Sequence, residues 1–293
     1  MTYNLKFQLL LLILSTFALS SFTSDKPAYR LYNKDGKRVK YKKVLNELQQ
    51  ADVIFFGEQH TNPISHWLQF EMASDLHNNT GDKLIIGAEM FESDNQLIIN
   101  EYLNGLISEQ RFENEARLWE NYQTDYKPLL IFAQKNNLPF IATNIPRRYA
   151  SVVYKLGFSG LDSLSAEARK YIAPLPIHYD PNLPSYKKMI TMSHVHKMDA
   201  TVSFFPQAQA IKDATMAWFI HKNYTEGHLF FHLNGSYHSD DSEGIVWHLK
   251  KYRPELNVKT ITTVEQEDVT QLNEENKKAD FIIVVHETMT KTH

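Results

Sequence analysis

The sequence predicts an α/β protein with a mainly parallel central sheet flanked by helices and a smaller helical subdomain. Short runs of β-branched and apolar residues alternate with helical segments near the start and the end of the chain. Most of these runs are continuously apolar, which is typical of strands that are covered on both faces. With 293 residues, of which 43% are hydrophobic, the chain is long enough to bury a full core.

Six runs are predicted to form strands, and the segments between several of them carry helix start signals. The strands are expected at residues 53–57, 83–90, 139–144, 228–235, 258–264 and 280–287. Asn62 can cap a helix that has Pro63 in its first turn. Pro128 and Pro146 are similarly placed to open helices, and Gly157 can close the second of these.

Two long stretches carry no strand signal, and we expect them to be mostly helical insertions into the α/β domain. They span about residues 94–136 and 160–224. Within the second stretch, residues 173–186 contain four prolines, which rule out a continuous helix there.

The amino terminus resembles a secretory signal peptide. An apolar run follows Lys6, and small residues follow that run, so residues 1–24 are predicted to be removed and residues 25–293 to form the mature domain. We therefore expect an exported protein, periplasmic or secreted, with no membrane span after removal of the signal. The chain has no cysteine, which excludes disulfides and lipidation at a cysteine. With a formal net charge of −3, the chain has no excess of positive charge to attract nucleic acid.

Polar side chains follow four of the predicted strands, and in a parallel sheet such strand ends lie along one edge. The residues concerned are Glu58, His60, Glu89, Glu92, Arg147, Arg148 and His238. His60, Glu89 and His238 are suitable ligands for a divalent ion such as Fe, Mn, Zn or Co. Without a metal, the same set offers a general base with an anion-binding arginine. A single Glu-x-His after a strand is more often a surface feature, so the repetition at four strand ends carries this hypothesis.

Other side chains could ligate haem iron or a soft metal. His194 and His196 lie among methionines at Met189, Met192 and Met198, and Tyr126 follows an aromatic segment. Methionines at helical spacing and aromatics in helical segments are more often core residues, so both alternatives stay open. His228 and His232 share one face of a predicted strand and are expected to be satisfied core histidines.

Several segments resemble the ChaN-like haem-binding family. They are "FFGEQHTNPISH", "GAEMFESDNQLIINEYLNG", "PFIATNIPRR", "QAQAIKDATMAWFI" and "NGSYH…EGIVWHL", which lie between about residues 45 and 265. This family belongs to a superfamily with the TIKI and TraB proteins and the erythromycin esterases. Its hallmark is a pair of Gly-x-x-His motifs with an intervening acid, seen here as Gly57 to His60, Gly235 to His238, and Glu89.

The resemblance implies an exported haem- or iron-binding protein that takes part in haem or iron acquisition. For ChaN-like members it implies haem ligation through tyrosine and two haems held in a dimer, so it allows a homodimer here. No tyrosine of this chain matches that ligand position with certainty. TIKI-like members imply metal-dependent peptide hydrolysis, and the esterases imply lactone hydrolysis with a histidine base. The alternative function is therefore a metal-dependent peptidase or esterase that uses Glu58, His60, Glu89, Arg147 and His238.

Overall fold

The computed structural model describes residues 26–292 except for residues 196–203, and it describes no side chains for residues 190–195. The predicted signal peptide lies outside the described residues, so its removal and the export that it implies stay predictions. Among the described residues, none of the helices combines the length and the apolar character that crossing a membrane requires.

The described residues form a seven-stranded sheet with the strand order β1-β7-β6-β2-β5-β3-β4. Strands β2 to β7 run parallel, and β1 pairs antiparallel with β7. The strands are β1 (Tyr29–Asn33), β2 (Val53–Glu58), β3 (Leu84–Glu92), β4 (Phe140–Asn144), β5 (Leu229–Gly235), β6 (Val258–Gln266) and β7 (Phe281–His286). The predicted α/β class with a mainly parallel sheet is confirmed.

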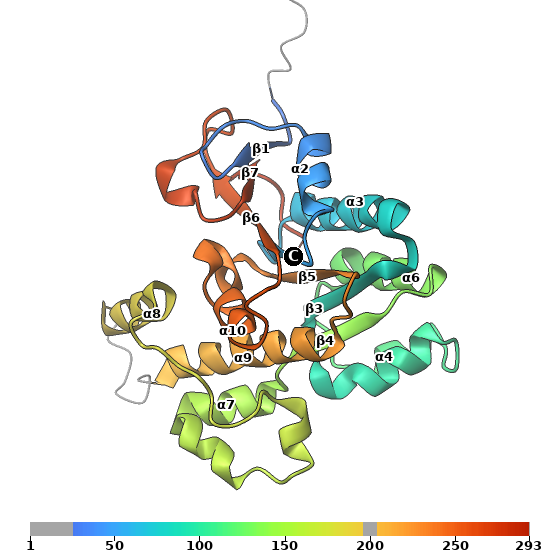
Figure 1. Ribbon diagram of the computed structural model, residues 1–293, viewed down its shortest axis with the longest axis vertical. Coiled ribbons are helices and arrows are strands. Elements are labelled where there is room, and N and C mark those ends of the chain that lie inside the picture. Colours follow the sequence, from blue (N-terminus) through green and yellow to red (C-terminus); the bar gives the residue numbers. More distant parts are fainter. Residues whose placement is uncertain (1–25, 196–203, 293) are drawn as a thin grey trace, which may run out of the picture.

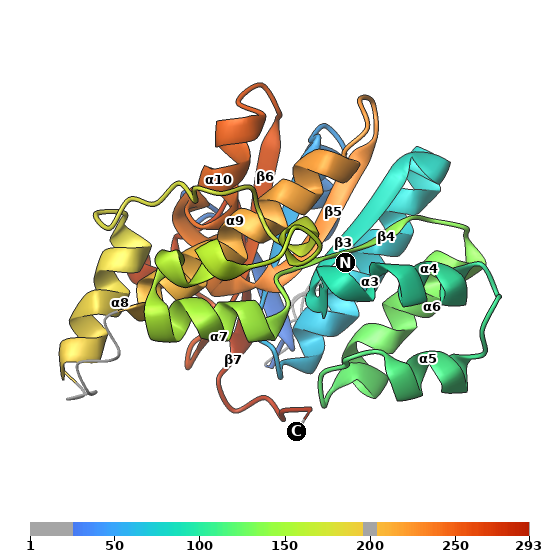
Figure 2. The same ribbon diagram turned by 90° about the horizontal axis from the view of Figure 1, so that it is seen from below.

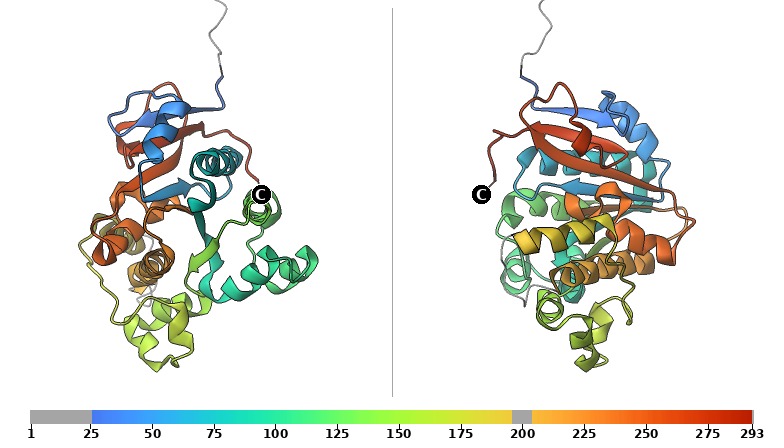
Figure 3. Two further views of the ribbon diagram at one scale, coloured as in Figure 1. Left: turned by 45° about the vertical axis from the view of Figure 1, so that its right-hand side comes forward. Right: turned by 90° about the vertical axis from the view of Figure 1, so that its left-hand side faces the viewer.

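Helices cover both faces of the sheet (Figures 1 and 2). They are α2 (Tyr41–Leu48), α3 (Pro63–Thr80), α4 (Gln96–Leu103), α5 (Glu109–Glu115), α6 (Lys127–Lys135), α7 (Arg147–Leu156), α8 (Pro184–Val195), α9 (Phe205–Asn223) and α10 (Ile245–Tyr252). A π-helical turn, Tyr122–Tyr126, precedes α6. Figure 3 shows β1 at one end of the sheet and α7 beyond the other end.

The continuous apolar strands are explained by two separate layers of core. In β2, Ile54 and Phe56 pack into the core on the side of α3 and α6, whereas Val53 and Phe55 pack against α9 and α10. Each of these four side chains is fully buried. Successive side chains of a strand point to opposite faces. In a strand with helices on both sides every position is therefore buried, which favours a continuous run of apolar residues.

All six predicted strands are observed within two residues of their expected bounds, and the predicted helix starts are confirmed. The Asn62 side chain accepts hydrogen bonds from the Ile64 and Ser65 amides at 3.1 and 3.2 Å. Helix α7 follows Pro146 and ends at Gly157. Strand β1 was not predicted, because it is a short antiparallel edge strand within a highly charged segment.

The two stretches that we expected to be helical contain no strand among their described residues. The first holds α4, α5, the π-helical turn and α6, and the second holds α8 and α9. Whether either stretch forms a separate subdomain stays a prediction.

Replacement of Gly57 by alanine should destabilise the fold by about 1–3 kcal/mol, which is the usual cost of overpacking. An added Cβ would lie 2.8 Å from the Ser236 Cα and 3.0 Å from the Ile261 carbonyl oxygen. Both are backbone atoms, which cannot rotate away as the end of a side chain can. Urea unfolding of the Gly57→Ala variant measures the cost. An unchanged unfolding midpoint would show that β2 and the turn after β5 can separate freely.

Candidate functional site

The four strands that end in polar sequence are neighbours in the sheet. They lie in the order β2, β5, β3 and β4, so their carboxyl ends form one continuous edge. A cleft of about 710 Å³ opens at this edge. It is lined by His60, Glu89, Glu92, Leu118, Trp119, Glu120, Asn121, Asn144, Ile145, Arg147, Ala150, Gln209, Lys212 and His238. The sheet topology thus gathers residues from distant parts of the chain, as parallel sheets generally do.

Glu58 holds His60 in a fixed orientation at the floor of the cleft. The Glu58 carboxylate is buried and accepts hydrogen bonds from His60 Nδ1 at 2.9 Å, the Tyr126 hydroxyl at 2.7 Å and Gln69 Nε2 at 2.5 Å. Because a carboxylate only accepts, the proton of this pair resides on Nδ1 of His60. The other nitrogen, Nε2, is thereby left to face the cleft.

Gly235 makes room for His60 at the carboxyl end of β5. An added Cβ at Gly235 would lie 2.8 Å from Cε1 and 2.9 Å from Nε2 of the His60 ring. The edge of Trp119 packs against the other side of this ring, with the ring centroids 4.9 Å apart. The His60 side chain is nevertheless 45% exposed, so solutes in the cleft can reach it.

The pKa of His60 is raised above its ordinary value. Burial disfavours the charged ring, but the hydrogen bond to Glu58 and the negative charges of Glu89 and Glu58 outweigh burial. His60 therefore binds a proton more tightly than a histidine in water.

His238 lies between two buried carboxylates. Its Nδ1 is 2.5 Å from Asp213 Oδ1, and its Nε2 is 3.3 Å from Glu89 Oε1. Burial disfavours its charge, but the attraction of Glu89 and Asp213 outweighs burial and raises the pKa of His238 to about 10. The ring is thus an imidazolium at neutral pH, and both of its nitrogens act as donors.

Glu89 and Asp213 have further partners that hold them in place. Glu89 Oε2 accepts the Gly235 amide at 2.7 Å, and Asp213 Oδ2 accepts the hydroxyl of buried Tyr186 at 2.8 Å. Burial alone would raise the pKa of Glu89, but the positive charge of His238 and its hydrogen bond hold that pKa well below its ordinary range. The carboxylate, imidazolium and carboxylate form one buried unit.

A network of arginines and acids borders the cleft. Glu92 at the end of β3 accepts from Arg117 Nε at 2.9 Å and also from Arg147 Nε. Asp94 in turn accepts from Arg148 at 2.6 Å and from Arg117. The network joins the segment after α5 to α7. The side chain of Arg117 is 39% exposed, that of Arg147 is 62% exposed, and that of Arg148 is 49% exposed.

Two polar groups of the cleft have no partner in the described part of the chain. Lys212 on α9 lines the cleft without any ion pair there. Gln209, one turn earlier, carries a buried Oε1 atom with no hydrogen bond. Buried polar atoms are nearly always satisfied, so the unpaired amide oxygen points to a ligand or a bound water.

No group of three or more histidine, aspartate or glutamate side chains that could hold a metal ion occurs among the described residues. In the described structure, Nδ1 of His238 is engaged by Asp213 at 2.5 Å, and its Nε2 lies 3.3 Å from Glu89. The metal site predicted from His60, Glu89 and His238 stays a prediction, and this geometry opposes it.

The structure places the candidate haem ligands outside the cleft lining or outside the described residues. Tyr126 is buried in the π-helical turn, and its hydroxyl donates to Glu58. Burial, together with the charge of Glu58, raises the pKa of Tyr126, which opposes the phenolate that iron needs. The side chain of His194 and all of His196 lie outside the described residues, so their ligand role stays a prediction.

The sequence analysis missed Asp213, Gln209 and Lys212, which all lie on α9. Asp213 is the one acid of α9 and is buried, and that lone acid was the available signal. Gln209 and Lys212 carried no comparable signal, because polar residues on a helix are usually solvated.

Comparison with protein families gives a match to a model described as "Haem-binding uptake, Tiki superfamily, ChaN" over residues 44–249. Comparison with curated proteins gives no match. Among solved structures, the chain is similar to ChaN of Campylobacter jejuni, which is described as binding haem cofacially. That similarity has 17% sequence identity and a TM-score of 0.67, and it covers 88% of this chain and 96% of that chain.

Two further solved structures show weaker similarity. A succinoglycan biosynthesis protein gives 11% identity and a TM-score of 0.48, covering 83% of this chain and 90% of that one. An erythromycin esterase mutant in its open conformation gives 10% identity and a TM-score of 0.46, covering 82% and 77%. At these TM-scores neither structure supports an argument about this chain.

Replacement of His238 by glutamine should cost about 3–5 kcal/mol at pH 7, because it leaves two buried carboxylates without their cation. It should also remove a pH dependence. The raised pKa of His238 means that its stabilisation is complete below about pH 6.5 and is lost as the pH rises towards 10.

Urea unfolding of wild type and His238→Gln at several pH values between 6.5 and 10 tests this. The wild type should lose stability across that range, and the variant should lose less. Equal slopes in the two proteins would contradict the assignment of the buried charge to His238.

Proposed function

The chain belongs to the haem-binding uptake family of ChaN in the Tiki superfamily, and from this premise we propose that it is an exported protein that binds haem for iron acquisition. The observation that carries the proposal is the family match over residues 44–249. The cofacial haem in ChaN of Campylobacter jejuni supports haem as the ligand, and the homodimer stays a prediction.

Helix α7 fits a haem iron better than the interior does. It carries Tyr149 and Tyr154, and the Tyr154 side chain is 36% exposed. The ring of Phe205 lies edge-on to Tyr154, with the centroids 6.4 Å apart. An accessible phenol on an apolar surface suits a porphyrin, which needs an axial ligand and an apolar contact.

One cation near Tyr149, Arg148, suits a haem propionate, because only one of its nitrogens is bonded to Asp94, at 2.6 Å. The Arg148 guanidinium lies over the Tyr149 ring at 4.5 Å, and one of its nitrogens is 3.3 Å from the Tyr149 hydroxyl. A guanidinium in that position also offsets the negative charge of a phenolate. When bound, haem would supply iron chemistry, and α7 would supply the ligand and the anchoring cation.

Haemin titration should therefore separate the tyrosines of α7 from Tyr126. Tyr149→Phe or Tyr154→Phe should remove the charge-transfer band of a ferric phenolate and weaken binding at least about tenfold, as expected for loss of an axial ligand. Tyr126→Phe is the matched control, and His194→Ala and His196→Ala test the remaining candidates. Retention of the band and the affinity in both α7 variants would contradict ligation by α7, and the absence of a stoichiometric endpoint in wild type would contradict haem binding.

A second candidate function, ester or peptide hydrolysis, is favoured by one observation. The carboxylate of Glu58 orients His60 so that Nε2 faces the cleft, which is the arrangement of a general base. His60 would take a proton from water, the water oxygen would attack the substrate carbonyl, and the leaving group would then accept that proton. Arg147 is paired with Glu92, so Lys212 is the cation left to stabilise the oxyanion.

Under this second hypothesis, hydrolysis should increase with pH through a midpoint above the ordinary histidine value, because the pKa of His60 is raised and only the neutral ring is a base. A screen of ester and peptide substrates over pH 5 to 9 measures this. His60→Gln should lower the rate about 100-fold or more. If wild type and His60→Gln hydrolyse every substrate equally, the hydrolase hypothesis fails and haem binding is unaffected.

A further inference from the structure

The segment of residues 26–43 is strongly basic in an otherwise acidic protein. It holds eight lysines and arginines and a single aspartate, whereas the whole chain has a formal net charge of −3. The cations are Lys26, Arg30, Lys34, Lys37, Arg38, Lys40, Lys42 and Lys43. The segment forms β1 and the start of α2, at the end of the sheet opposite β4 (Figure 3).

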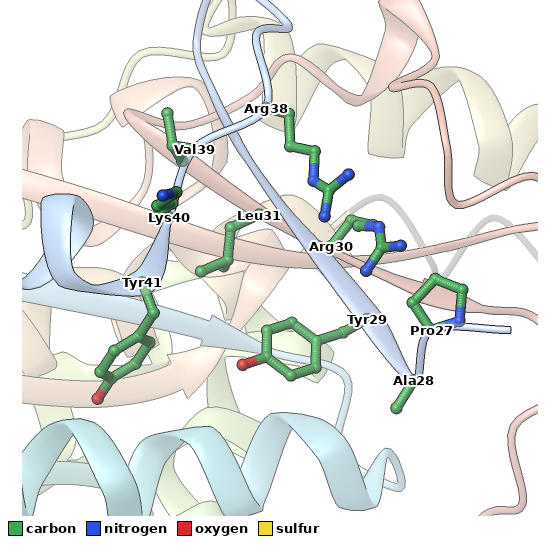
Figure 4. A pocket seen from close by; sticks show the side chains of 9 residues that line it. All are labelled: Pro27, Ala28, Tyr29, Arg30, Leu31, Arg38, Val39, Lys40 and Tyr41. Carbon is green, nitrogen blue, oxygen red and sulfur yellow. The ribbon is translucent and has the colours of Figure 1, made fainter. Parts of the chain in front are cut away.

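Part of this segment surrounds a cavity of about 630 Å³, shown in Figure 4. Its lining consists of Pro27, Ala28, Tyr29, Arg30, Leu31, Arg38, Val39, Lys40 and Tyr41. Three of these side chains are cations and none is an acid. The volume lies within the range of about 300–1,000 Å³ that is typical of small-molecule sites.

The two guanidinium groups lie on the same side of β1. Arg30 and Arg38 point to one side in Figure 4, and the rings of Tyr29 and Tyr41 point towards α3. Burial raises the pKa of Tyr32, the positive charges of Arg38 and Arg30 oppose that rise, and the negative charge of Asp268 adds to it. Two like charges are therefore held on one side of β1.

The cations of the cavity have no protein counter-charge. Within the described part of the chain, Arg30, Arg38 and Lys40 make no ion pair, and Lys43 alone of the basic segment makes one, at 4.0 Å from Glu47. Three acids lie nearby without an ion pair to these cations. Asp75 accepts the Tyr41 hydroxyl at 2.9 Å, the charge of Glu71 acts on Tyr29 and Tyr41, and the charge of Asp268 acts on Tyr32. A bound anion would supply the ion pairs that the three cations lack.

The edge of β1 adds a backbone donor to the cavity. The Leu31 carbonyl accepts the Val39 amide, and the Asn33 amide donates to the Lys37 carbonyl, so alternate residues of β1 face this edge. The same alternation turns the Tyr29 amide to the edge, where β1 and the segment of residues 38–41 separate to form the cavity.

We propose that the cavity between β1 and residues 38–41 binds a phosphate-bearing anion through Arg30, Arg38 and Lys40. A guanidinium donates two parallel hydrogen bonds to phosphate oxygens, and three cations match a group with more than one negative charge. The ligand is either a free phosphate compound or a phosphorylated lipid headgroup. This site lies apart from the haem surface of α7, so the proposal does not depend on haem binding.

Titration calorimetry of the full protein with inorganic pyrophosphate at physiological salt tests the site. The variant Arg30→Gln/Arg38→Gln/Lys40→Gln should bind at least about tenfold more weakly than wild type, because it loses the charge-assisted bonds. The matched control, Lys34→Gln/Lys42→Gln/Lys43→Gln, removes the same charge outside the cavity and should change the affinity less than about threefold. Equal unfolding midpoints establish that both variants are folded.

Cosedimentation with vesicles of phosphatidic acid, compared with phosphatidylcholine alone, distinguishes the two sources of phosphate. Vesicle binding that is lost only in the cavity variant supports a lipid headgroup, and pyrophosphate binding without cosedimentation supports a free anion. Equal weakening in both variants would show a diffuse field and overturn the proposal, as would the absence of binding by wild type to either probe. Haemin titration of the cavity variant should match wild type, so this proposal and the proposed function can fail separately.

Discussion

The position of β5 between β2 and β3 is the constraint on which the functional edge depends. Because β5 pairs in parallel with both neighbours, the turn that carries His238 lies between the ends that carry His60 and Glu89. The approach is so close that only glycine fits at Gly57 and Gly235, where an added Cβ would lie 2.8 Å from a neighbouring atom. The cleft is therefore a product of strand order and strand register.

Charge within this site is arranged in two layers of different accessibility. The inner layer consists of Asp213, His238 and Glu89, which are buried and paired with one another, so it fixes geometry. The outer layer consists of His60, which a solute can reach, and of Lys212, which has no ion pair in the described part of the chain. The outer layer is better placed to act on a solute, because the inner groups are buried and bonded to one another.

The sequence predicted the parallel sheet well because continuous apolar strands leave a strong pattern, and it predicted the convergence of strand ends from topology alone. It could not predict bonding within the site. The raised pKa of His238 follows from Glu89 and from Asp213, which reaches the ring from a distant helix, and no spacing encodes that second contact. Of the two strand histidines, His232 is a buried core residue bonded to Thr143, as predicted, whereas His228 is not in the core, so that prediction was wrong. Edge strand β1 escaped prediction because it is short and lies within a highly charged segment.

The arginine network around Glu92 and Asp94 has a mechanical consequence. Arg117 anchors one wall of the cleft, and Arg147 and Arg148 anchor the other. All three arginines bind Glu92 or Asp94 at the end of β3. These contacts are ion pairs whose arginines are partly exposed to solvent. Dissolved salt therefore weakens them, whereas it does not weaken apolar contacts. Salt should therefore weaken the attachment of the two walls to the end of β3 more than it weakens the apolar core.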